Sequence, residues 1–370
     1  MTVSEYTIAL ISAVLHDEIP PEKPDELGFD ELLTFVHRHK LENICFAAVE
    51  RLNGQPDETR KRKWSRSRDI NLAQALAQEQ EKRVLTEAFS AAGLPFLPMK
   101  GWYLRGAYPQ MDFRFMSDID ILIRREDRDR CCKLMQKLGY SREWEDTGSN
   151  DSYQKAPYLH VELHYDMVGL DFKEWHLYYK NIWDRAYPAG AYEYALSRSD
   201  YYIYMVVNFA KDYQTKGTGI RSALDFYIFL ERYRDELDEG YVERELERLG
   251  LRELSDAAAE LAYGWFGRDA ERVRPGELAA KLAQDGIYGS KRQLVQISYA
   301  EITKNHTTRL GKKMAFLLRR AFQGPEKMRY KYPVLEKAPI LLPVFWIVRW
   351  CRHLDDIRQE LDVVKKIGKE

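Results

Sequence analysis

Residues 94–124 read LPFLPMKGWYLRGAYPQMDFRFMSDIDILIR, and the fold is predicted outward from this stretch because two strand patterns lie within it. Its first part, 94–101, is a short apolar run bounded by proline and glycine, which is typical of a buried strand. Its last part, DIDILIR at 118–124, is the next clear strand, because β-branched and bulky apolar residues dominate it. The stretch therefore predicts the first two strands of a small sheet.

Two carboxylates lie on the second of these strands. Asp118 and Asp120 are two residues apart, so strand alternation places both side chains on one face. Taken alone, such a pair is more typical of a solvated sheet edge or a turn. The neighbours Ile119 and Ile121 instead indicate a buried strand, where two carboxylates are costly unless a cation or partner compensates their charge. We therefore interpret the pair as a candidate metal site.

A third carboxylate follows on another strand. In YLHVELHYDMV, residues 158–168, the apolar residues Val161 and Leu163 flank Glu162, so the glutamate points away from them. A lone glutamate in a strand usually just faces solvent. Three carboxylates from neighbouring strands, however, are what phosphoryl chemistry with two divalent cations requires, and hard cations such as Mg²⁺ take oxygen ligands. The sequence predicts catalytic metal ligands at all three positions, with Mg²⁺ (or Mn²⁺) as cofactor.

Helical patterns surround this predicted sheet. Apolar residues recur at three- and four-residue spacing in 10–15, 29–52, 71–93, 201–213 and 220–234. The fold class is therefore α+β, a small mixed β-sheet core flanked by N-terminal and C-terminal helical regions. We divide the chain into an N-terminal helical region (1–92), the core (93–195), a helical domain (196–323) and an aromatic, basic C-terminal tail (324–370). The helical domain is expected on the side where an acceptor for phosphoryl chemistry would bind.

The composition is that of an ordinary globular protein. Apolar residues make up 45% of the 370 residues and the formal net charge is −1, which excludes the disordered class and any overall attraction to polyanions. The cysteines show no paired metal spacing. The N-terminus has no basic leader, and the longest apolar run, 340–348, is far shorter than the roughly 20 residues that span a bilayer. We expect no transmembrane segment and a cytoplasmic location.

The run 97–140 resembles a family of bacterial, mostly uncharacterised nucleotidyltransferases within the DNA polymerase β superfamily. The strand with Glu162 and His164 looks like the family's third-carboxylate strand, and 206–230 resembles its helical partner region. The resemblance covers most of the chain from about residue 30 to 350. The following residues match the family's motif position by position: Lys100, Gly101, Arg114, Ser117, Asp118 and Asp120 in the core, and Lys211, Gly217, Gly219, Arg221 and Asp225 in the helical region.

One departure concerns the phosphate loop. The wider superfamily usually has Gly-Ser before the helix, whereas this chain has Lys100-Gly101. The resemblance implies that both residues bind the nucleotide, Lys100 through its charge and Gly101 by letting the backbone approach the phosphates at a helix start. Similar Lys-Gly forms occur in toxin nucleotidyltransferases of the abortive-infection type.

Three further matched positions have two interpretations each. Arg114 stabilises the transferring phosphoryl group in the catalytic interpretation, and forms a salt bridge to one of the aspartates in the other. Ser117 binds nucleotide, or it caps the turn before the strand. His164 assists Glu162, or it is a packing residue.

The helical region has the same ambiguity. Lys211 and Arg221 are a second nucleotide contact oriented by Asp225, or they belong to a set of structural ion pairs.

Two basic stretches lie outside these motifs. RKRKWSRSR at 60–68 has the composition of a nucleic-acid patch with Trp64 available for stacking, but we favour a solvated helix face because acidic residues adjoin it. The tail at 325–354 mixes basic and aromatic residues, and we favour packing on the core over a membrane or partner surface.

The sequence thus predicts an enzyme that moves a nucleoside monophosphate from an NTP to an acceptor hydroxyl. The acceptor is a small molecule, a protein or an RNA end, and the lack of net positive charge disfavours nucleic acid. The alternatives are a non-catalytic nucleotide-binding or partner-binding module with the same fold, and the toxin of a toxin–antitoxin pair.

Overall fold

The computed structural model of the chain describes residues 1–143, 150–215, 217–268 and 276–285, scattered positions between 311 and 332, and the segment 334–352. Its centre is a five-stranded sheet of order β1-β2-β5-β4-β3. Strands β2 and β5 are parallel and the other neighbours are antiparallel, so the sheet is mixed, as predicted. The strands are β1 (Phe96–Pro98), β2 (Ile119–Ile123), β3 (Ser141–Glu143), β4 (Asn150–Lys155) and β5 (Leu159–His164).

The register of β2 on β5 sets the two faces of the sheet. Asp120 lies opposite Glu162, and Ile119 opposite Val161. Because side chains alternate along each strand, the apolar members of these pairs share one face and the carboxylates share the other. Ile119, Ile121 and Val161 are fully buried on the apolar face.

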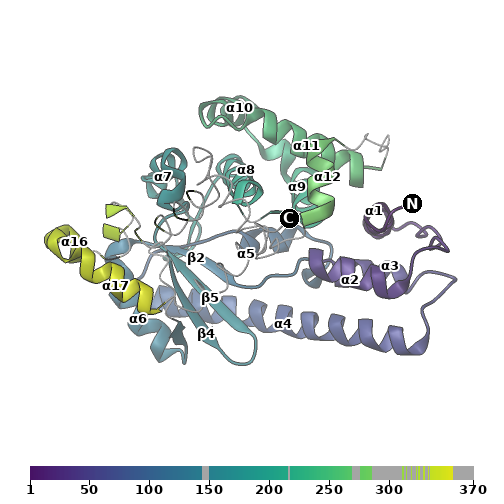
Figure 1. Cartoon of the computed structure of the whole chain (residues 1–370), viewed down its shortest axis with the longest axis horizontal. Helices are drawn as coiled ribbons and strands as arrows, with labels where there is room; N and C mark the ends of the chain where they lie inside the picture. Colours follow the sequence, from purple (N-terminus) through teal and green to yellow (C-terminus); the bar gives the residue numbers. More distant parts are fainter. Residues whose placement is uncertain are drawn as a thin grey trace.

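Helices cover both faces of the sheet. On the apolar face, Leu85 and Phe89 of the long helix α4 (Glu58–Ala91) and Cys131 of α6 (Arg128–Lys137) form one core with the isoleucines of β2. In Figure 1, α4 lies at the level of β4 and β5, and α5 (Gly101–Leu104) and α8 (Arg198–Thr215) lie above it. Lys100, next to α5, contacts Asp120, and Tyr201 of α8 contacts Lys100, so these two helices lie on the carboxylate side of the sheet.

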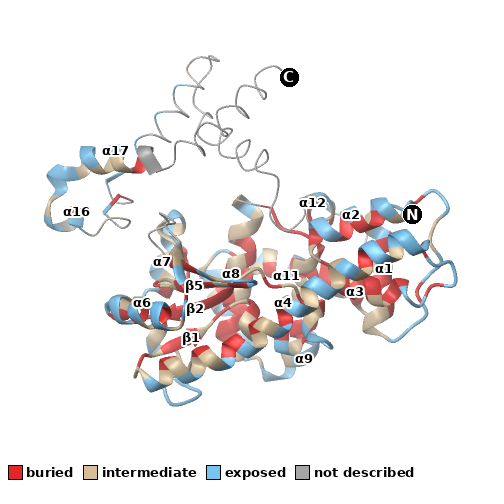
Figure 2. Ribbon diagram, turned by 90° about the horizontal axis from the view of Figure 1, so that it is seen from below, coloured by how far each residue is buried: buried red, intermediate tan, exposed pale blue. Residues whose placement is uncertain are grey.

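The N-terminal and C-terminal helices share a second core. Leu10 of α1, Ile44 of α3, Phe229 of α9 and Leu261 of α11 belong to one cluster of buried residues. Figure 2 shows buried segments in α1, α3 and α11 as well as in the strands. These helices are α1 (Val3–Leu15), α2 (Phe29–His39), α3 (Glu42–Val49), α9 (Ile220–Tyr233), α10 (Glu239–Arg248) and α11 (Arg252–Phe266).

Smaller elements complete the described residues. The remaining α-helices are α7 (Lys173–Tyr179), α12 (Glu277–Asp285), α16 (Val334–Lys337) and α17 (Leu342–Arg352), and β6 (Tyr187–Pro188) pairs with β7 (Tyr194–Ala195). Short 3₁₀ helices are η1 (Arg105–Ala107), η2 (Met111–Phe113), η3 (Arg125–Asp127), η4 (Leu170–Phe172), η5 (Ile182–Asp184), η6 (Arg234–Glu236) and η7 (Pro339–Leu341). Among these residues, no helix has the length and apolar character to span a membrane.

The α+β class predicted from the sequence is confirmed, with local corrections. The segment 29–52 does not form one helix: Lys40 adopts a left-handed conformation with φ 56°, which ends α2 before α3 begins. Strands β3 and β4 were not predicted. Residues 286–310 of the predicted helical domain (196–323) lie outside the described residues, and the division at residues 92, 195 and 323 stays a prediction.

Candidate active site

A tight turn after β1 holds Lys100 over β2. The Met99 amide donates to the Asp120 carbonyl (3.1 Å), and the Trp102 amide donates back to the Met99 carbonyl (3.1 Å). Between them Lys100 has φ 43°, a conformation that L residues rarely adopt. The Tyr201 hydroxyl of α8 donates to the Lys100 carbonyl at 2.6 Å. The helical region therefore fixes the backbone of this turn directly.

Gly101 is required at the start of α5 by close packing. A Cβ at this position would lie 2.6 Å from Arg114 Nη1 and 2.6 Å from Met116 Cγ. Both distances are shorter than carbon atoms tolerate, so only glycine fits without displacing its neighbours. Close packing is thus a steric reason for the glycine, and its role in nucleotide binding stays a prediction.

The three predicted carboxylates lie close together on the sheet face that Lys100 contacts. Two sets of potential ligand atoms each lie within 4.8 Å of one another, one in Asp120, Glu162 and His164, the other in Asp118, His160 and Glu162. Glu162 belongs to both sets because it lies between the two histidines on β5. Carboxylate and imidazole groups at this separation could hold two divalent cations.

Cationic side chains occupy the centre of the cluster. Lys100 Nζ lies 2.5 Å from Asp120 Oδ1, and His164 Nε2 lies 2.7 Å from the same oxygen and 3.1 Å from Glu162 Oε2. Burial acts to raise the pKa of Asp120, but Lys100 and His164 hold it well below its ordinary value. Burial and Lys100 act to lower the pKa of His164, but its contacts with Asp120 and Glu162 raise it.

The pKa of Asp118 shifts in the opposite direction to that of Asp120. Burial, and then the negative charge of Asp120, raises its pKa to about 6, although Lys100 opposes the shift. A buried carboxyl group whose pKa is raised by a neighbouring carboxylate lacks enough nearby positive charge to stabilise its ionised form. A divalent cation would supply that charge, so the donor set and its electrostatics fit a metal site.

Arg114 lies beneath the Lys100 turn. Its Nε and Nη2 atoms donate to the two oxygens of Asp225 at 2.8 and 3.0 Å, and the Tyr108 hydroxyl donates to the same carboxylate at 2.6 Å. The carboxyl partner is therefore Asp225 of α9 and neither Asp118 nor Asp120. The ion pair connects α9 to the loop that leads into β2.

The other predicted nucleotide-binding residues contact different parts of the structure. The Ser117 side chain hydrogen-bonds to Asp118 and acts to lower the pKa of its carboxyl group. Lys211 Nζ of α8 donates to Asn208 Oδ1 at 2.8 Å, and Arg221 Nη1 of α9 donates to the Phe115 carbonyl at 3.1 Å. Arg221 thus contacts the backbone just before β2. The role of each in nucleotide binding stays a prediction.

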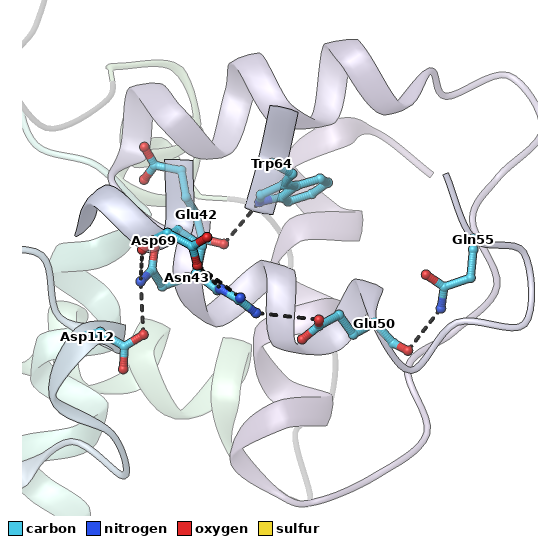
Figure 3. Close-up of polar contacts among 8 residues, drawn as sticks. Glu42, Asn43, Glu50, Gln55, Trp64, Asp69 and Asp112 are labelled. Carbon is cyan, nitrogen blue, oxygen red and sulfur yellow. Dashed lines mark hydrogen bonds and ion pairs between the residues drawn. The ribbon is translucent and has the colours of Figure 1, made fainter. Parts of the chain in front are cut away.

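The basic stretch 60–68 lies on α4, where Trp64 is buried and its indole N–H donates to the Glu42 carbonyl at 3.2 Å (Figure 3). Figure 3 also shows Asn43 donating to Asp112, 2.9 Å away. A buried indole offers no exposed face on which a base could stack. The geometry of Trp64 is therefore that of a packing residue, which agrees with the favoured interpretation of a helix face.

A mixed sheet with three carboxylates on one face, next to a glycine turn at a helix start, is an architecture consistent with a nucleotidyltransferase core. The family model described as "Uncharacterised nucleotidyltransferase" matches residues 25–267, and the chain belongs to this family. The match includes every site residue described above. No curated protein and no solved structure matches the chain.

Two supporting residues were not predicted as part of the site. Tyr201 fixes the Lys100 turn from α8, and Gln78 of α4 donates to the Met116 carbonyl at 3.1 Å. Each joins segments that are far apart in the sequence, and an interior tyrosine or glutamine in a helix carries no local signal of such a contact. Only the buried position of a polar side chain on a helix indicates that it needs a partner.

Proposed function

We propose that the protein is a nucleotidyltransferase that uses divalent cations to transfer a nucleoside monophosphate from an NTP to an acceptor hydroxyl. The acceptor oxygen forms a bond to the α-phosphorus, the bond from that phosphorus to the pyrophosphate leaving group breaks, and the hydroxyl proton leaves to a base. The observation that carries the proposal is the convergence of Asp118, Asp120 and Glu162 on one sheet face beside Lys100.

Each carboxylate has a role in this proposal. Asp118, Asp120 and Glu162 would hold the cations, and Glu162 would hold the ion that activates the acceptor hydroxyl or would serve as its general base. When bound, the cations would activate the hydroxyl and stabilise the charge of the leaving pyrophosphate. Mg²⁺ and Mn²⁺ are both candidates on this evidence.

The turn and the residues beneath it bind the triphosphate. Lys100 supplies an ammonium charge, and the Gly101 amide at the start of α5 lets the backbone approach a phosphate. Ser117 lies beside Asp118 and offers a hydroxyl. Arg114 is held by Asp225 against Gly101, so we assign it a positioning role together with a fixed positive charge below the phosphates.

Lys211 and Arg221 give a second phosphate contact from the helical side. Arg221 contacts the backbone that leads into β2, so it lies on the side of the site where α9 meets the sheet. The acceptor is a small molecule, a protein side chain or an RNA end, and it enters between the helices and the carboxylate face.

One observation favours a second candidate, a non-catalytic nucleotide-binding module. Lys100 and His164 both contact Asp120 Oδ1, so they neutralise part of the carboxylate charge without a cation. In that case the protein would bind NTP, and replacing Asp118 would leave this binding unchanged. A toxin with the same transferase chemistry would differ from a biosynthetic enzyme only in its acceptor.

The test is transfer of α-labelled phosphate. Each of the four NTPs, labelled at the α-phosphorus, is incubated with the protein, Mg²⁺ or Mn²⁺ and a cell extract that is then separated into small molecules, protein and RNA. We expect label in one fraction, and loss of transfer in Asp118→Asn and Asp120→Asn. Asp129→Asn, an exposed carboxylate on α6, is the matched control and should keep full activity. If the wild type transfers no label, and if NTP binding is unchanged in Asp118→Asn and Asp120→Asn, the proposal that the protein is an enzyme is refuted.

A further inference from the structure

His164 is placed as a cation ligand would be. Its Nε2 atom lies 2.7 Å from Asp120 Oδ1 and 3.1 Å from Glu162 Oε2, and its side chain is only 12% exposed. In octahedral geometry with bonds of about 2.1 Å, adjacent ligand atoms are about 3.0 Å apart. The separations of His164 Nε2 from Asp120 Oδ1 and from Glu162 Oε2 are therefore already close to those of neighbouring ligand atoms around one cation, and all three groups lie within 4.8 Å of one another.

Hydrogen bonding alone accounts poorly for this arrangement. A ring nitrogen carries at most one hydrogen, so Nε2 can make one good hydrogen bond, yet it faces two carboxylate oxygens. Asp120 Oδ1 in addition accepts from Lys100. A cation between the three atoms would take a lone pair from each of them, and Nε2 would then carry no proton.

His160, the other histidine of β5, belongs to the second set of potential ligands, with Asp118 and Glu162. His160 Nε2 lies 2.6 Å from the Ser152 hydroxyl of the neighbouring strand β4. Both histidines are on the same face of β5, two residues to either side of Glu162. His164 Nε2 lies within 3.1 Å of two carboxylate oxygens, whereas His160 Nε2 hydrogen-bonds to a serine.

We propose that His164 is a direct metal ligand, so that one cation position has a nitrogen donor beside Asp120 and Glu162. The proposal rests on the proposed function and names the metal class of that site. Mg²⁺ prefers oxygen and water, whereas an imidazole donor favours first-row transition ions. The protein therefore prefers Mn²⁺ or a later ion of that row over Mg²⁺.

The experiment uses Mn²⁺ as a paramagnetic probe on the full chain without nucleotide. Electron spin-echo spectra of bound Mn²⁺ should show coupling to an imidazole ¹⁴N nucleus in the wild type and in His160→Asn, and no such coupling in His164→Asn. Competition between Mn²⁺ and Mg²⁺ should show the Mn²⁺ preference of the wild type falling at least about tenfold in His164→Asn. His160→Asn tests the other histidine of β5, and His37→Asn, an exposed histidine of α2, is the matched control outside the cluster. Thermal unfolding verifies that all three variants are folded.

The outcomes separate this proposal from the proposed function. Bound Mn²⁺ without ¹⁴N coupling in the wild type overturns the ligand assignment, and this result needs no variant. Coupling lost in His160→Asn instead of His164→Asn also overturns it. If that happens while labelled NMP transfer persists with Mg²⁺, the proposed function stands. If Mn²⁺ couples to ¹⁴N but no NMP transfer occurs with any cation, the proposed function fails and the ligand assignment stands.

Discussion

His39 of α2 forms a hydrogen bond that connects the N-terminal helices to α9, the helix that carries Asp225. It lies at the end of α2 with 0% of its surface exposed, and its ring packs on Phe35 with centroids 4.4 Å apart. The Ile220 amide, the first of α9, donates to His39 Nδ1 at 3.2 Å. Because only an unprotonated Nδ1 can accept this hydrogen bond, the fold requires a neutral histidine.

The pH dependence follows from this requirement. Burial, and then the charge of Arg38, lowers the pKa of His39 from 6.5 to about 3. Below pH 6.5 the unfolded chain binds a proton that the folded chain does not, so stability that is present above pH 6.5 is lost as the pH falls towards 3. Linkage gives a loss of about 2 kcal/mol at pH 5, and about 5 kcal/mol in total below pH 3.

The assay is urea unfolding at pH 7.5 and pH 5, followed by far-UV circular dichroism. Asp118 titrates in the same range with the opposite sign: its folded pKa of about 6 lies above the ordinary value of 3.8, so it adds stability as the pH falls. The informative quantity is therefore the difference between the wild type and His39→Asn, in which the amide oxygen replaces Nδ1 as acceptor and does not titrate.

We expect the wild type to lose about 2 kcal/mol more than His39→Asn between the two pH values. The variant should be less stable than the wild type at pH 7.5, because asparagine fills less of the space beside Phe35. Parallel pH profiles in the two proteins would refute the argument, since they would mean that His39 is protonated equally in the folded and unfolded chains.

Two substitutions test the support of the Lys100 turn. Gly101→Ala, whose Cβ would lie 2.6 Å from Arg114 Nη1, should lower the free energy of unfolding by about 1–3 kcal/mol and weaken NTP binding measured by calorimetry, whereas Gly106→Ala, with nothing within 4 Å of its Cβ, should change neither. Asp225→Asn leaves the buried Arg114 guanidinium without its carboxylate and should cost about 3–5 kcal/mol in urea unfolding, against no measurable change for the exposed Asp235→Asn. If Gly101→Ala and Gly106→Ala have equal effects, the first prediction is wrong. If Asp225→Asn and Asp235→Asn have equal effects, the second is wrong.

The carboxylates of the site could be predicted because their signal is local. Alternation places Asp118 and Asp120 on one face of β2 whatever the rest of the chain does, and the same holds for Glu162 on β5. That these strands are adjacent and parallel is not contained in either pattern. The adjacency of β2 and β5 depends on tertiary contacts, and before the structure only the family resemblance indicated that the two strands lie together.

The missed strand β4 shows the opposite case. Residues 150–155 read NDSYQK, with no apolar alternation, yet Asp151 and Ser152 are buried. Asp151 is held by Arg128, by Arg142 and by the Tyr165 hydroxyl. Tertiary ion pairs compensate the burial of these polar groups, and the pattern of a single segment cannot reveal partners elsewhere in the chain.

The structure also gives a physical reason for the Lys-Gly pair that stands in place of Gly-Ser. At φ 43° the position of Lys100 is one that glycine adopts freely, and a side chain there costs on the order of 1–3 kcal/mol. The hydrogen bond from Tyr201 and the ion pair with Asp120 offset this cost, so the turn keeps its shape although it lacks glycine. A glycine would preserve the backbone and leave Asp120 without its ammonium partner. We therefore interpret Lys100 as a source of positive charge on the turn itself. A bound triphosphate and the carboxylates would compete for contact with its ammonium group.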